Sequence, residues 1–130
     1  MKKLSVMTRT KAQFVDLTRE IQAAVKEIGL DDGFITVYVP HTTAGVTINE
    51  HADPDVVKDM LLTLDQLVPW DNPGYRHNEG NSAAHVKASM MGSSVRIIVE
   101  GGRLCLGTWQ GIFFCEFDGP RQREVWVKPE

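Results

Sequence analysis

Hydrophobic and polar residues alternate at the start of the chain, and helical spacing follows. Leu4, Val6 and Thr8 have polar neighbours, which predicts an opening strand, and we expect a short second strand that includes Phe14. Apolar residues then recur every three or four positions, and Gly29 supplies a C-terminal stop. These apolar residues are Leu17, Ile21, Ala24, Val25 and Ile28. The pattern therefore predicts two strands followed by an amphipathic helix.

The next segment has the composition of a strand pair. Gly33–Val39 is rich in β-branched and aromatic residues, and Pro40 ends this predicted strand. Gly45–Asn49 reads as its partner. The four residues His41–Ala44 should therefore lie in a turn or bulge between the two strands.

A second helix and a long loop are predicted in the middle of the chain. Asp53-Pro54 combines a capping carboxylate with proline at the first helical position, and Pro69 stops this helix. Residues 69–82 have the proline, glycine and asparagine content of a loop, and a loop this long in a small domain is often functional. A short helix over Ser82–Met90 should follow, closed by Gly92.

The last third of the chain is predicted to be β-structure. Four strands are expected, Val95–Val99, Arg103–Leu106, Gly111–Phe117 and Glu124–Val127. The run Ile112–Phe117 is apolar on both faces, and such a strand needs cover on both sides. In so small a protein we expect another subunit to supply the second cover, which predicts a homo-oligomer.

These elements predict one α+β domain over residues 1–130, with a mixed or antiparallel sheet and two to three helices. The net charge is −3 and no long Lys/Arg run occurs, which argues against a general nucleic-acid binder. No apolar stretch follows the charged N-terminus and none is long enough to span a bilayer. We therefore expect no signal peptide, no membrane partner and a cytoplasmic location. Cys105 and Cys115 lie in apolar runs and are expected to be reduced and buried, although a disulfide stays open.

Three histidines carry the candidate chemistry. His41 follows a strand and a proline, His77 lies in the long loop, and His85 is in the first turns of the short helix. Three imidazoles at such positions can form an open site for zinc or another divalent metal, with room for water or substrate. Their spacing matches no tight zinc motif, so unrelated surface or capping roles remain an alternative. Without a metal, the same residues could act as general acids or bases or bind phosphate.

Several polar residues could support these histidines. Asn49 and Glu50 are candidates to orient the imidazoles, as metal-bound histidines require, and Glu79 is a similar candidate. Thr42 and Thr43 could hold an anion in their turn. The basic candidates for a phosphate are Arg76, Lys87 and Arg121, with Ser89 as a hydroxyl donor. For each of the threonine, basic and serine candidates taken alone, a solvated surface role is the favoured alternative.

Three sets of motifs together resemble one family. The first is Pro40-His41-Thr42-Thr43-Ala44-Gly45-Val46-Thr47-Ile48-Asn49-Glu50 followed by Asp53-Pro54, and the second is His77-Asn78-Glu79-Gly80-Asn81 with Ala84-His85-Val86-Lys87. The third comprises Gly102-Arg103-Leu104, Gly107-Thr108-Trp109-Gln110-Gly111-Ile112 and Glu116-Phe117-Asp118-Gly119-Pro120-Arg121. On these motifs the chain resembles the YjbQ-like family over essentially its whole length.

The resemblance implies a small α+β fold that trimerises through its sheets, with His41, His77 and His85 in one pocket for a metal ion or an anion. It also implies a secondary thiamine-phosphate synthase activity, in which hydroxymethylpyrimidine diphosphate and thiazole phosphate are joined and diphosphate is released. We assign His41, His77, His85 and Glu50 to catalysis, and Thr42, Thr43, Asn49, Lys87 and Arg121 to phosphate. A non-catalytic binding protein for a phosphometabolite or metal, and a zinc-dependent hydrolase, are the alternatives.

Overall fold

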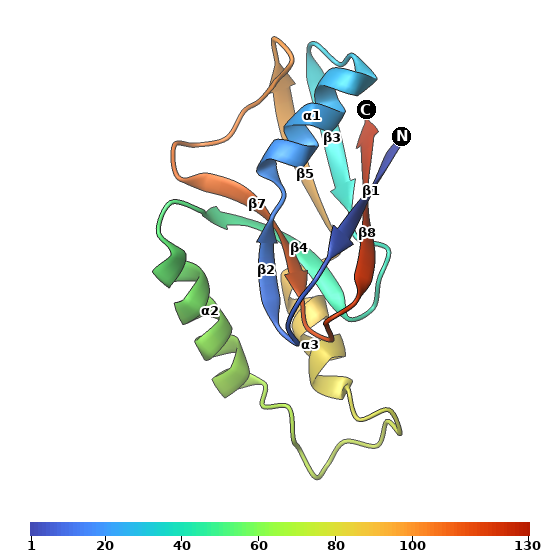
Figure 1. Cartoon of the computed structure of the whole chain (residues 1–130), viewed down its shortest axis with the longest axis vertical. Helices are drawn as coiled ribbons and strands as arrows, with labels where there is room; N and C mark the ends of the chain where they lie inside the picture. Colours follow the sequence, from blue (N-terminus) through green and yellow to red (C-terminus); the bar gives the residue numbers. More distant parts are fainter.

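Eight strands form two antiparallel sheets in a computed structural model that describes residues 1–130 (Figure 1). The five-stranded sheet has the order β1-β8-β3-β5-β6, and the three-stranded sheet has the order β2-β7-β4. The first comprises β1 (Lys2–Met7), β8 (Gln122–Pro129), β3 (Gly33–Tyr38), β5 (Ser94–Glu100) and β6 (Arg103–Leu104). The second comprises β2 (Gln13–Asp16), β7 (Gln110–Glu116) and β4 (Ala44–Glu50). The predicted α+β class is confirmed, with two sheets in place of one. The predicted pairing of the strands on either side of His41 is wrong, because β3 pairs with β5 and β8 and β4 pairs with β7.

Three helices accompany the sheets, each close to its predicted position. Helix α1 (Thr18–Ile28) ends at Gly29, whose φ of 79° lies in the left-handed region that favours glycine. Helix α2 (Pro54–Leu67) begins at Asp53, whose carboxylate accepts a hydrogen bond from the Asp55 amide at 2.9 Å. Helix α3 spans Ser82–Met91. No helix is long and apolar enough to cross a membrane.

Strand β7 separates two hydrophobic clusters, and this position accounts for its apolar sequence. On one face, Ile112 and Phe114 join a core with α1 and the five-stranded sheet. On the other face, Phe113 and Cys115 pack with Leu64 of α2 and residues of α3. Both faces are therefore covered within one chain, and the argument that a second subunit must cover this strand is wrong.

The two cysteines differ in their surroundings. Both are free, and Cys115 is buried as predicted. Cys105 is exposed: its amide still donates to the Ile98 carbonyl oxygen of β5 at 2.8 Å, but its side chain alternates with partly buried Leu104 and Leu106 and is exposed like that of Arg103. The prediction that both thiols are buried is therefore wrong for Cys105. An apolar sequence around a cysteine does not tell which side of the strand its thiol lies on.

Candidate functional site

Three segments meet at one end of the molecule and surround a polar cavity of about 480 Å³. They are the loop between β3 and β4, the turn between β7 and β8, and the start of α3 with the loop that precedes it (Figure 1). No hydrophobic residue lines the cavity. Its lining residues are Pro40, His41, Thr42, Thr43, His77, Glu79, Asn81, His85, Asp118, Arg121 and Arg123. The three predicted histidines therefore share one cavity.

Backbone hydrogen bonds hold these segments together. The Phe117 amide donates to the carbonyl oxygen of Thr43 at 3.2 Å, which ties the β3–β4 loop to the β7–β8 turn. The Gly80 amide donates to the carbonyl oxygen of His77 at 3.1 Å, and the φ of Gly80 is 73°. This tight turn returns the chain to α3, where His85 lies in the first turns. Local turn geometry thus brings His77 beside His85.

The His77 and His85 rings are the closest pair of imidazoles at the site. Their centroids lie 5.6 Å apart with the planes at 80°. Nε2 of His77 also lies 3.8 Å from Oε1 of Glu79. Zinc–nitrogen bonds of about 2.0–2.1 Å would separate the centroids of two imidazoles on one tetrahedral ion by roughly 5 Å. The spacing of this pair therefore suits a shared divalent metal.

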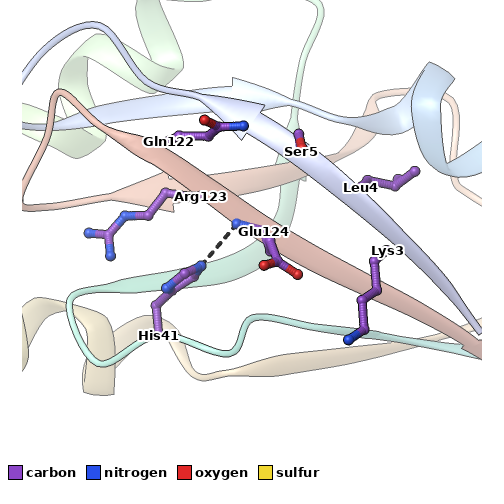
Figure 2. Close-up of a pocket in the computed structure, with 7 residues that line it drawn as sticks. All are labelled: Lys3, Leu4, Ser5, His41, Gln122, Arg123 and Glu124. Carbon is purple, nitrogen blue, oxygen red and sulfur yellow. Dashed lines mark hydrogen bonds between the residues drawn. The ribbon is translucent and has the colours of Figure 1, made fainter.

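His41 is held differently from the other two histidines. Its Nε2 accepts a hydrogen bond from the backbone amide of Glu124 at 2.9 Å (Figure 2). Burial and the neighbouring charge of Arg123 lower the pKa of His41 below its usual value, so the neutral ring is favoured. As the side chains stand, no group of three or more His, Cys, Asp or Glu residues could hold a metal ion. His77 and His85 thus lie close together as a pair, and a three-histidine metal site does not fit this geometry.

Arg123 and Glu116 form a buried ion pair behind the cavity. Arg123 Nε donates to Glu116 Oε1 at 2.8 Å, and Nη2 donates to Oε2. Thr8 Oγ1 and the amides of Phe117 and Asp118 also donate to the Glu116 carboxylate. Burial raises the pKa of Glu116, but these hydrogen bonds outweigh burial and hold it below the usual value. The pair therefore links β7, β8 and Thr8, the residue that follows β1, at the cavity wall.

Two threonines and Arg121 lie where the sequence placed them. Thr42 and Thr43 line the cavity, and Thr43 Oγ1 accepts a hydrogen bond from Arg123 Nη2 at 2.8 Å. Arg121 is half-exposed, and its Nη2 lies 3.2 Å from Asp118 Oδ2. Asp118 Oδ2 also accepts a hydrogen bond from Asn81 Nδ2 at 2.8 Å. Arg121 is therefore at the cavity, with its charge partly offset by a carboxylate.

The structure does not bring the remaining predicted residues to the cavity. Asn49 and Glu50 lie at the far end of β4, and seven strand residues at about 3.3 Å each separate that end from the histidine loop by roughly 20 Å. Asn49 Nδ2 instead donates to the sulfur of Met60. Lys87 is buried on α3, with Nζ 3.6 Å from Oδ1 of Asp65 on α2. Within one chain, the predicted contacts of these three side chains with the histidines or their ligand are wrong. Arg76 and Ser89 do not line the cavity either, although Ser89 lines an adjoining one with His41 and His85.

Sequence reasoning missed Arg123, Asn81, Asp118 and Glu116 as parts of the site. A glutamate at the end of an apolar strand run was a usable signal for Glu116, because a buried carboxylate requires a charged partner. Arg123, Val125 and Val127 occupy every second position of β8 and are buried on the same face. That alternation could have identified it as the partner.

Comparison with known proteins gives one consistent result. The family model described as "UPF0047 protein YjbQ-like" matches residues 2–129. The UPF0047 protein YugU of Bacillus subtilis is 54% identical over 128 residues, which cover 98% of this chain and 97% of that protein. The UPF0047 protein MJ1081 of Methanocaldococcus jannaschii is 51% identical over 126 residues, with 97% and 91% coverage. A crystal structure of an uncharacterised YjbQ/UPF0047 protein from Clostridium acetobutylicum has a TM-score of 0.97 and 55% identity, with both chains fully covered.

Proposed function

Because the chain belongs to the YjbQ-like UPF0047 family and its three histidines line one polar cavity, we propose that it is an enzyme acting on phosphorylated small molecules. The specific reaction is that of a secondary thiamine-phosphate synthase. Hydroxymethylpyrimidine diphosphate and thiazole phosphate are joined, and diphosphate leaves. The observation that carries this proposal is the combination of three imidazoles with two arginines around a cavity that has no hydrophobic lining residue.

The chemistry requires a site that receives negative charge. The bond between the pyrimidine methylene carbon and the diphosphate oxygen breaks, and its electron pair leaves with the diphosphate. The thiazole nitrogen then supplies the electron pair of the new C–N bond. Hydrogen-bond donors placed where charge develops on the leaving oxygen lower the barrier. Arg121 and Arg123, with Thr42 beside them, are the donors that this cavity offers.

A divalent metal such as zinc is part of the proposal, with His77 and His85 as the side chains that would hold it. When bound, such an ion would supply positive charge toward the diphosphate. Glu79, near His77, is positioned to keep that imidazole in place.

We also propose that the chain assembles as a homotrimer through its sheets, as the resemblance implies. Large apolar side chains on the outer face of the five-stranded sheet support this assembly. Tyr38 is 41% exposed and Ile98 is 49% exposed. Trp126 lies 5.7 Å from Tyr38, measured between ring centroids. Sedimentation equilibrium tests the proposal: a mass of one 14.5 kDa chain would contradict it.

The proposed reaction is tested by initial rates of thiamine phosphate formation with purified protein, with and without zinc. His77→Asn and His85→Asn should each lower the rate by at least about tenfold, since each removes a group that holds the ligand or metal. Lys58→Met is the matched control, because Lys58 is exposed on α2 and pairs only with Asp55. An unchanged rate in His85→Asn would refute the site assignment. Binding of the precursors without product would favour the non-catalytic alternative.

A further inference from the structure

Arg123 is almost fully buried, yet one of its nitrogen atoms has no acceptor. Its side chain is 4% exposed, and Nε and Nη2 are occupied by Glu116 and Thr43. Nη1 donates to no atom of the chain, although Arg123 lines the cavity. The one side-chain atom that is both fully buried and unpartnered is Asn81 Oδ1, so Arg123 Nη1 keeps some accessible surface. Arg123 and His41 both line this cavity and also the neighbouring pocket beside Lys3 and Ser5. A guanidinium held in this way by a carboxylate and a threonine has one nitrogen left to donate a charge-assisted hydrogen bond to an oxyanion.

The hydrogen bond between Glu124 and His41 determines where the imidazole proton lies. A backbone amide can only donate, so Nε2 of His41 must present its lone pair to the Glu124 amide. In a neutral ring the proton is then on Nδ1. No acceptor for Nδ1 exists within the chain, and the atom is not fully buried. Figure 2 shows one ring nitrogen directed at the Glu124 amide and the Arg123 guanidinium beside the ring.

We propose that the Nδ1–H group of His41 and Nη1 of Arg123 form an oxyanion subsite, and that His41 is not a metal ligand. A metal at Nε2 would displace the Glu124 amide, and a metal at Nδ1 would require an imidazolate ring. Two unpartnered donors on one cavity wall instead suit an oxygen that carries negative charge. This inference rests on the proposed function, because it assigns a phosphate oxygen of the substrate to these two groups.

The charge balance limits what the subsite accepts. Glu116 already pairs with Arg123, so the subsite adds hydrogen-bond donors and little net positive charge. It therefore suits one non-bridging oxygen of a diphosphate, with the remaining charge met by Arg121, which lines the same cavity. The substrate class is a small molecule with a terminal diphosphate. The terminal phosphate group lies against His41.

Two substitutions of His41 separate its two nitrogen atoms. His41→Asn keeps an amide donor near the Nδ1 position. His41→Gln places its amide near Nε2 and has no donor at the Nδ1 position. Calorimetric titration with inorganic pyrophosphate should show about tenfold weaker binding for His41→Gln, the effect of one charge-assisted hydrogen bond, and a smaller loss for His41→Asn. Equal binding by the wild-type and His41→Gln proteins would overturn the subsite.

Titration with zinc tests whether His41 is a ligand. His41→Gln should keep the zinc affinity of the wild-type protein within about threefold, whereas His85→Gln should lose at least about tenfold. An equal loss in both variants would overturn the inference. A ¹⁵N-edited spectrum of the folded protein supplies a readout that needs no substitution: the proton of His41 should be on Nδ1, and a proton on Nε2 would refute the assignment.

The outcomes also separate this inference from the proposed reaction. If pyrophosphate binding depends on His41 but no thiamine phosphate forms, the reaction is wrong and the oxyanion subsite stands. If thiamine phosphate forms and His41→Gln changes neither its rate nor pyrophosphate binding, the subsite is wrong and the reaction stands.

Discussion

Arg123 donates hydrogen bonds to both carboxylate oxygens of Glu116, and the two side chains are 4% and 0% exposed. A buried ion pair is costly to break, because the remaining charge stays in the interior without a partner. Glu116→Gln keeps the shape of the side chain and removes its charge. We expect it to lower the free energy of unfolding by about 3–5 kcal/mol, measured by urea denaturation at pH 7.

The matched control for this substitution is Glu130→Gln, which removes the charge of the exposed Arg96–Glu130 pair. Solvent and salt screen exposed pairs, so this variant should be nearly as stable as the wild-type protein. If Glu116→Gln is no less stable than Glu130→Gln, the buried pair does not stabilise the folded protein.

Acid should destabilise the protein through the same carboxylate. Burial raises the pKa of Glu116, but hydrogen bonds from Arg123, the Asp118 amide and Thr8, with the charge of Arg123, hold it below 4.5, its ordinary value. A lowered pKa contributes stability above that ordinary value, and this contribution is lost as the pH falls through the pKa of the folded state. Urea midpoints measured from pH 7 to pH 3 should therefore fall more steeply for the wild-type protein than for Glu116→Gln. Parallel curves would contradict this explanation.

Substitution of Glu50 tests whether the catalytic site lies within one chain. Glu50 lies at the far end of β4 from the three histidines. If the site is confined to one chain, Glu50→Gln should change the rate of thiamine phosphate formation by less than about twofold, whereas His85→Asn should abolish most of it. A large loss in Glu50→Gln would show that a second copy brings this carboxylate to the cavity. In that case, a mixture of the two inactive variants should regain activity.

The two thiols should differ in reactivity. Cys105 is exposed, whereas Cys115 is buried in β7 and burial strongly raises the pKa of its thiol. A disulfide reagent added to the native protein should therefore modify one thiol, and the second only after unfolding in urea. Cys105→Ser should remove the native reaction and leave the second one. Rapid modification of both thiols before unfolding would contradict the burial of Cys115.

Local signals predicted most of the fold. Gly29 and Asp53 mark the helix ends that the sequence assigned to them, because capping depends on a few neighbouring residues. The cover of β7 was not predictable in the same way. Its second face is covered by Leu64 and Ala88, which lie 49 and 25 positions from Phe113, and periodicity cannot identify such distant partners.

For the candidate site too, local signals were predictive and contacts between distant segments were not. The sequence correctly placed His41, His77 and His85 in one cavity, since each lies at an element end or in a loop next to a polar segment. Within one chain, it wrongly added Asn49, Glu50 and Lys87. Asn49 and Glu50 share a motif with His41, but they lie at the end of β4 that is farther from His41. The buried position of Arg123 depends on the pairing of β8 and β7 with their neighbours, which no local pattern contains.

The most direct test of the central claim is ³¹P NMR of purified wild-type protein and His85→Asn with both thiamine precursors. The wild-type protein should release free diphosphate and form thiamine phosphate, whereas His85→Asn should leave the precursor signals unchanged over the same time. Broadened precursor signals without free diphosphate would show a binding protein in place of an enzyme. Unchanged precursor signals with the wild-type protein would contradict the proposed function.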